Sequence, residues 1–161
     1  VTTVFTGPGF RGGGQVSELV SLIDLPPTLL DSAGIDVPEH MQGRSVMPLL
    51  SGSSAEWPED VFVQISEAQT GRAVRTKRWK YGVDAPGESG SSSDSYVEQY
   101  LYDLQADPYE LNNLVGHQSH AGVAEVMAQR LVRRMREAGE DEPKIEHAEV
   151  RGSGQRTVSE K

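Results

Sequence analysis

The chain contains no cysteine, no long apolar run and relatively few cations, and each of these absences narrows what it can be. Without cysteine it forms no disulfide and no thiolate metal site. Apolar residues make up only 36% of the chain, and no run approaches the roughly 20 residues that span a membrane. The chain contains 15 Lys and Arg residues and 24 Asp and Glu residues. The resulting net charge of −9 disfavours nucleic acids and anionic membranes as partners.

Turn-forming and apolar residues predict the elements of the first third. The β-branched segment Val1–Phe5 is typical of a strand. Asp24 stands at the N-cap of a helix, because two prolines follow it at positions where the first helical N–H groups lack partners anyway. Gly34 ends this helix, and Ser45–Leu50 is predicted to form a short helical turn.

The remainder is predicted to contain three strands and a long helix. Alternating apolar residues predict the strands at Val61–Ile65, Ala73–Val83 and Tyr96–Tyr102. Between the last two strands, Gly87–Ser95 is typical of a flexible connection. Further along, the sequence predicts one helical turn at Tyr109–Leu114 and an amphipathic helix at Ala121–Ala138.

These elements predict an α/β to α+β architecture in three parts. Residues 1–55 are interpreted as the incomplete end of a larger α/β domain. Residues 56–139 are expected to form a small α+β subdomain, in which the long helix packs on one face of an antiparallel sheet. Residues 140–161 are charged and poor in large apolar groups, so a disordered tail is predicted there.

The residues that could carry chemistry are few, and structural interpretations account for them. Gly7–Gly12 matches G-x-G-x-x-G, but Pro8 removes one N–H group and further glycines oppose the helix that a dinucleotide site requires. His117 and His120 have no carboxylate or thiol framework with metal-site spacing beside them. A metal-ligand role for Asp24 is the weaker alternative to the helix cap.

Four segments and the helix that follows them resemble the C-terminal part of type I sulfatases, which belong to the alkaline phosphatase superfamily. They are VSLIDLPPTLLDSAG from Val20 to Gly34, GRSVMPLL from Gly43 to Leu50, AVRTKRWKY from Ala73 to Tyr81, and LYDLQADPYELNNL from Leu101 to Leu114. The resemblance covers roughly Val1 to Gly139 and rests on the order of the segments. It implies the last strand–helix piece of an alkaline-phosphatase-like sheet, followed by a small antiparallel sheet packed by a C-terminal helix.

The same resemblance implies chemistry whose residues this chain does not contain. Sulfatases use a formylglycine made from the motif C/S-x-P-x-R, and a divalent cation, usually calcium, polarises the ester. None of the nine prolines here is followed two residues later by arginine, so that motif is absent. We therefore expect no catalytic residue and no metal ligand in this chain, and no activity of the chain alone.

The resemblance also implies partners and two candidate substrate-binding residues. The partners are an N-terminal catalytic domain of the same protein and, in the intact enzyme, a sulfated small molecule or glycan. Glu67 and Arg72 are the candidates, because the segment between them is predicted to join two strands and such loops carry function more often than strands do.

Two alternatives stay open at the level of sequence. One is the C-terminal part of a phosphonate or phosphodiester hydrolase of the same superfamily. The other is a non-catalytic module that binds a partner through an exposed apolar patch on the face that a catalytic domain would cover. Neither the cellular compartment nor the oligomeric state follows from the residues.

Overall fold

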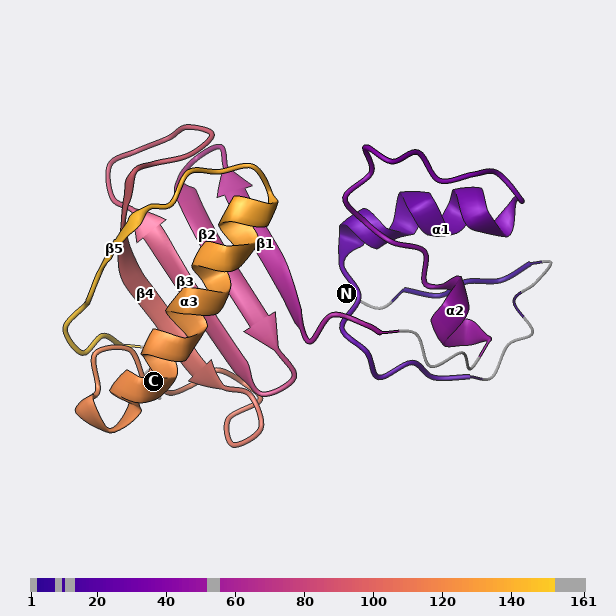
Figure 1. Cartoon of the computed structure of the whole chain (residues 1–161). Coiled ribbons are helices and arrows are strands. Elements are labelled where there is room, and N and C mark those ends of the chain that lie inside the picture. The colour runs from indigo at the N-terminus through magenta and orange to yellow at the C-terminus, as the bar shows by residue number, and fades with distance from the viewer. Residues whose placement is uncertain (1–2, 8–9, 11–13, 52–55, 153–161) are drawn as a thin grey trace, which may run out of the picture. The chain divides into compact units, whose positions relative to one another are not determined.

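The chain divides into two compact units, Val1–Glu59 and Asp60–Lys161, in a computed structural model that describes residues 3–7, 10, 14–51 and 56–152 (Figure 1). The boundary lies a few residues beyond the one predicted at residue 55. In the described ranges, no helix is both long enough and apolar enough to cross a membrane.

The first unit is built around two short helices. A 3₁₀ turn at Leu22–Asp24 leads into α1 at Leu25–Ser32, and α2 spans Met47–Leu50. The prediction of both helices is confirmed, including the two prolines in the first turn of α1. Thr3–Phe5, in contrast, lie outside any strand, because a strand needs a neighbour to pair with and the described residues of this unit offer none. Val1 and Thr2 lie outside the described residues, as does most of the Gly7–Gly12 motif.

Asp24 occupies the predicted N-cap position of α1, but its carboxylate makes no capping hydrogen bond to the first turn of that helix. The carboxylate accepts the N–H groups of Ser21 at 2.8 Å and of Arg44 at 2.9 Å. The Thr28 hydroxyl donates to the Asp24 carbonyl at 2.6 Å and accepts the N–H of Val46 at 2.9 Å. The segments Val20–Gly34 and Gly43–Leu50 are therefore joined by hydrogen bonds, and Asp24 has a structural function.

Replacing Gly43 by alanine is expected to destabilise the first unit by about 3 kcal/mol or more, because the added carbon overpacks against backbone that cannot move aside. A Cβ atom at Gly43 would lie 1.9 Å from the carbonyl oxygen of Ile23. Urea unfolding followed by Trp57 fluorescence, in a Trp79→Phe background, measures the effect. Gly14→Ala is the matched control, since nothing lies within 4 Å of a Cβ atom there. Equal midpoints for the two variants would contradict the prediction.

The second unit is a five-stranded sheet with one helix packed on it (Figure 1). The strands are β1 (Asp60–Ser66), β2 (Thr70–Thr76), β3 (Trp79–Ala85), β4 (Ser95–Asp103) and β5 (Lys144–Glu146), in that spatial order. The first four pair antiparallel, and β5 pairs parallel to β4. Helix α3 (Ala121–Glu137) packs on one face, where the core contains Val74, Tyr81, Val83, Tyr96, Leu101, Met127, Leu131 and Met135. The prediction of an antiparallel sheet covered by the C-terminal helix is confirmed.

The structure differs from the sequence prediction at three places in this unit. The segment Ala73–Val83 is a hairpin, because the Thr76 hydroxyl accepts the N–H groups of Arg78 and Trp79 and reverses the chain. Tyr109–Leu114 is not helical, and Glu110 has a φ angle of 56°. Within the predicted disordered tail, Lys144–Glu146 form β5, since their backbone groups pair with the edge of β4 and Ile145 packs on the core.

Candidate functional site

The two predicted substrate-binding residues occupy different environments. Glu67 is exposed in the turn between β1 and β2. Arg72 lies in β2 rather than in the connection, and its side chain is fully buried, with 0% of its surface exposed. The alternation of β2 sets this direction, because residues 70, 72 and 74 all face α3 and the core. The position predicted for Arg72 was therefore wrong, and its buried charge needs partners.

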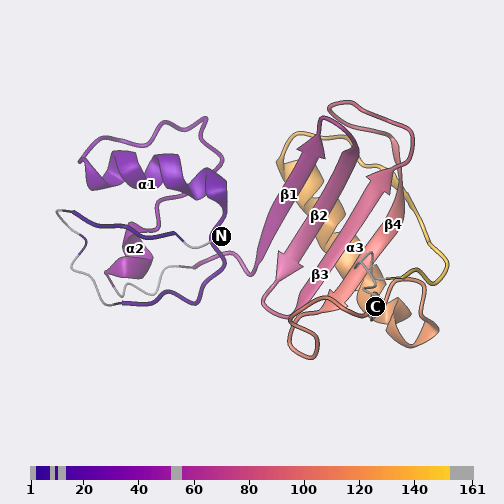
Figure 2. The same ribbon diagram turned by 180° about the vertical axis from the view of Figure 1, so that it is seen from behind.

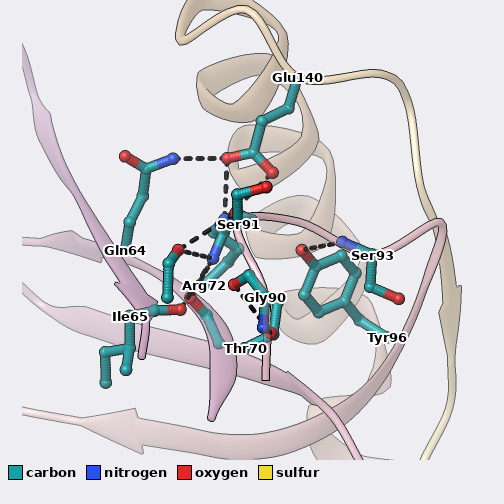
Figure 3. A network of polar contacts seen from close by, with 11 residues as sticks. Gln64, Ile65, Thr70, Arg72, Gly90, Ser91, Ser93, Tyr96 and Glu140 are labelled. Atoms are coloured by element: carbon teal, nitrogen blue, oxygen red, sulfur yellow. Dashed lines mark hydrogen bonds and ion pairs between the residues drawn. The ribbon is translucent and has the colours of Figure 1, made fainter. Parts of the chain in front are cut away.

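Those partners come from three separate segments of the second unit (Figure 3). The Nε atom of Arg72 donates to both carboxylate oxygens of Glu140, at 2.8 and 3.1 Å. Its Nη1 atom donates to the carbonyls of Ile65 at 3.0 Å and Gly71 at 2.8 Å, and its Nη2 atom donates to the carbonyl of Ser91. We call these five residues the Arg72 cluster. It joins the end of β1, the β3–β4 loop and the segment that follows α3.

The β3–β4 loop is held by its backbone at several points. The Thr70 hydroxyl accepts the N–H of Gly90 at 2.8 Å and donates to its carbonyl at 3.1 Å, while the Thr70 N–H donates to the carbonyl of Glu88. The N–H of Ser93 donates to the Tyr96 hydroxyl at 3.1 Å. The loop that the sequence describes as a flexible connection is thus tied to the sheet. Its exposed side chains, Glu88, Ser89, Ser91 and Ser92, are presented on a fixed backbone.

This arrangement can hold loops in position. Within residues 3–7, 10, 14–51 and 56–152, no three or more His, Asp or Glu side chains are grouped so that they could hold a metal ion. The guanidinium of Arg72 donates to protein atoms through all three of its nitrogens, whereas the Glu67 carboxylate faces solvent. Direct contact of either residue with substrate stays a prediction, and the geometry favours Glu67 for it.

Sequence reasoning missed Glu140, Thr70 and Ser91 as members or supports of this cluster. Glu140 lies 68 residues from Arg72 in the chain and within the segment predicted to be disordered. Ser91 contributes a backbone carbonyl, which any residue type would supply. Only Arg72 itself was identified from the sequence, and there it was the last residue of a predicted connection between two strands.

A second polar group lies at the segment Leu101–Leu114. The carboxylate of Asp103 accepts three hydrogen bonds from Nε and Nη2 of Arg78, the shortest at 2.8 Å, and it also accepts the N–H groups of Gln105 and Ala106. The Arg78 guanidinium holds the pKa of Asp103 below its ordinary value of 3.8, although partial burial opposes the shift. The Asp107 carboxylate similarly accepts the N–H of Asn112 at 2.7 Å, which lowers its pKa.

Asp103→Asn is expected to make the stability of the second unit less dependent on acid pH. Because the pKa of Asp103 is lower in the folded chain than in the unfolded one, its contribution is fully present above about pH 4 and is lost as the pH falls through the lowered pKa. Free energies of unfolding measured from pH 7 to pH 2 should therefore converge for wild type and variant at the acid end. A difference that stays constant over this range would contradict the prediction.

A groove of about 720 Å³ lies between α3 and residues 142–147. Its rim carries charges of both signs, and these pair with one another: Arg133 with Glu137 at 3.7 Å, and Arg136 with Glu142 at 3.5 Å. Since the charges are mutually compensated, the groove offers no set of groups converging on one ligand.

Comparison with known protein families gives a match that runs through both units. The model of the family described as "N-sulphoglucosamine sulphohydrolase, C-terminal" matches residues 5–137. Arylsulfatase K of Xenopus laevis is 34% identical over 127 residues, which are 72% of this chain and 22% of that protein. The chain thus spans about a fifth of the length of this curated relative.

Solved structures show the same likeness. One is a protein in complex with its substrate D-glucosamine-2-N,6-O-disulfate; it is 26% identical, with a TM-score of 0.62, over 74% of this chain and 24% of that one. A phosphonate monoester hydrolase from Silicibacter pomeroyi has a TM-score of 0.64 at 23% identity, over 82% of this chain and 28% of that one. At that identity the second comparison establishes a shared fold alone.

Proposed function

We propose that this chain completes an enzyme that hydrolyses sulfate esters. The premise is that the chain belongs to the sulfatase family and corresponds to the C-terminal portion of its members. The observation that carries the proposal is the family match over residues 5–137, which includes nearly all of the first unit and, in the second unit, strands β1 to β4 and helix α3. The chain contains no C/S-x-P-x-R motif, so the nucleophile belongs to the part of the enzyme that precedes it. The chain by itself is accordingly inactive.

In the intact enzyme, the second unit supplies loops at the entrance of the substrate pocket. The Arg72 cluster supports this role, because it fixes the β1–β2 turn and the β3–β4 loop to one another. Glu67 contacts the substrate directly, and Arg72 acts by holding both loops in position. The substrate is a sulfated sugar or another sulfated small molecule; a related structure was solved with D-glucosamine-2-N,6-O-disulfate bound.

Calcium and formylglycine are the cofactors of the proposed reaction, and both belong to the catalytic part. The described residues of this chain do not fit a calcium site, since they contain no cluster of three or more carboxylate or imidazole side chains. Every role that we assign to this chain therefore concerns positioning and binding.

An assay with an aryl sulfate in the presence of calcium tests the proposal. The longer polypeptide that contains this chain is expected to hydrolyse the ester, and the purified chain is not. In the longer polypeptide, Glu67→Ala should raise KM for a sulfated sugar without changing kcat, because it removes an acceptor for the sugar hydroxyl groups and that contact serves binding only. Turnover by the chain alone would overturn the assignment of the nucleophile, and unchanged KM would exclude the role of Glu67.

The second candidate is a phosphonate or phosphodiester hydrolase of the same superfamily, and the Silicibacter pomeroyi enzyme shows that such a hydrolase can have this fold. The same polypeptide assayed with a phenyl phosphonate ester distinguishes the two. A kcat/KM for the phosphonate that exceeds that for the sulfate would select this candidate.

A further inference from the structure

The segment that follows α3 runs beside β4, at one edge of the sheet (Figure 2). We call residues 140–152 the C-terminal strap; they lie beyond the family match, which ends at residue 137. The strap begins at Glu140, a member of the Arg72 cluster, and continues through β5. It then passes close to Gly116, where an added Cβ atom would lie 2.4 Å from the carbonyl carbon of Glu149. The strap therefore contacts the rest of the second unit along most of its length.

A buried carboxylate on β4, that of Glu98, is the anchor of this strap. Its side chain is 3% exposed. One oxygen accepts the Tyr81 hydroxyl at 3.0 Å, and the other accepts the N–H of Ala148, in the strap, at 3.1 Å. Burial raises the pKa of the Tyr81 hydroxyl, and the charge of Glu98 raises it further, so this hydroxyl keeps its proton and stays a donor. Both donors are neutral, whereas a buried charge is most stable beside an opposite charge.

The strap offers such a charge through His147. Its Nδ1 atom lies 3.4 Å from the Glu98 oxygen that also accepts the Ala148 N–H. In the part of the chain that the structure describes, no other basic side chain forms an ion pair with Glu98. The His147 side chain is 75% exposed, so it exchanges protons freely with water. Imidazole gains its charge between pH 8 and pH 5, and Glu98 therefore acquires a cationic partner only in acid.

The other charged groups around His147 do not replace it in this role. Glu125 on α3 and Glu142 in the strap line the same groove, and both carry negative charge. The cations of this region are already paired with other carboxylates; they are Arg133, Arg136 and Lys144. Protonation of His147 thus adds a positive charge where the uncompensated groups are carboxylates.

We propose that the C-terminal strap is an acid-strengthened clamp, in which protonated His147 pairs with buried Glu98 and holds the strap against β4. The pair forms where a carboxylate and an imidazolium coexist, between about pH 4.5 and 6.5, and is lost at higher pH as the imidazole loses its charge. Because the strap begins at Glu140, the clamp also supports the Arg72 cluster and the two loops that this cluster fixes. Only this effect on the loops rests on the proposed function.

Hydrogen exchange of the strap amides in this chain tests the clamp, with each rate corrected for the intrinsic effect of pH on exchange. The N–H groups of Lys144 and Ala148, which donate to the Asp94 carbonyl and to Glu98, should be up to about fivefold better protected at pH 5.5 than at pH 8, the limit for an ion pair with one exposed partner. His147→Gln should abolish this difference and leave protection at pH 8 unchanged. His117→Gln, at another exposed histidine of the same unit, should keep it.

Two results would overturn the clamp: equal protection of the wild-type strap at the two pH values, or a difference that persists in His147→Gln. Glu98→Gln gives a second measurement, because it removes the charge that His147 pairs with and should also abolish the difference. The amides of α3 serve as the internal reference, and an equal change there would show a general effect of pH on the unit and contradict the proposal.

Kinetics of the longer polypeptide test the effect on the loops separately. His147→Gln should raise KM for a sulfated sugar at pH 5.5, by at most about fivefold, and leave KM at pH 8 and kcat at both pH values unchanged. An unchanged KM at pH 5.5 would overturn the link from the clamp to the loops. The exchange readout requires no turnover, so a polypeptide without sulfatase activity whose strap still responds to His147 would sink the proposed function and leave the clamp standing.

Discussion

Replacing Arg72 by alanine is expected to lower the free energy of unfolding of the second unit by about 3–5 kcal/mol, the range for removing one partner of a buried ion pair. The substitution leaves the Glu140 carboxylate, whose side chain is 11% exposed, without its cation. It also removes the donors to the carbonyls of Ile65, Gly71 and Ser91. Urea unfolding followed by circular dichroism measures the loss.

A double-mutant cycle with Glu140 separates the ion pair from the other contacts of Arg72. Glu140→Gln alone should cost less, because Glu140 lies at the rim of the cluster while Arg72 lies at its centre. The two substitutions combined should cost less than their sum, since both remove the same interaction. Arg75→Ala is the control, because Arg75 lies on the same strand with an exposed side chain. Additive losses would show that the pair contributes nothing beyond its separate parts.

The elements that the sequence predicts well are those whose pattern is local. The four-residue spacing of Met127, Leu131 and Met135 predicts helix α3 to within one residue, and all three side chains are buried. Asp24 and the prolines after it likewise place the start of α1. In each case, the position of the helix can be predicted from residues that lie within two helical turns of one another.

The features that sequence reasoning missed depend on contacts between distant residues or on unusual turn chemistry. The β2–β3 hairpin turns at Lys77 and Arg78, neither of which is a typical turn residue, and the Thr76 hydroxyl supplies the stabilisation. Strand β5 has a single apolar residue, Ile145, and forms because the edge of β4 is available. The pairing of Arg72 with Glu140 has no local signature, so nothing in the sequence indicates that this candidate substrate ligand is buried and paired with a carboxylate.

Asn113→Ala is expected to destabilise the second unit by about 2–6 kcal/mol, because it leaves two buried N–H groups without partners at about 1–3 kcal/mol each. The Oδ1 atom of Asn113 accepts the N–H groups of Leu101 at 3.0 Å and Val115 at 3.1 Å, and both of these residues are fully buried. Its Nδ2 atom donates to the carbonyls of Gln99 at 2.8 Å and Gly152 at 3.2 Å. One side chain thus joins β4, the loop before α3 and the segment after β5.

The neighbouring residue provides a matched control for this prediction. Asn112→Ala changes the same residue type one position away, where the side chain is exposed, and should shift stability by about 0.5 kcal/mol or less. Asn113→Asp keeps an acceptor for Leu101 and Val115 but removes both Nδ2 donors and places a carboxylate oxygen beside the carbonyl of Gln99, so it should also destabilise. Equal urea midpoints for Asn112→Ala and Asn113→Ala would contradict the prediction. Asn113, which lies in the sulfatase-like segment Leu101–Leu114, would then have a function other than stability. Contact with substrate in the intact enzyme would be the next hypothesis to test.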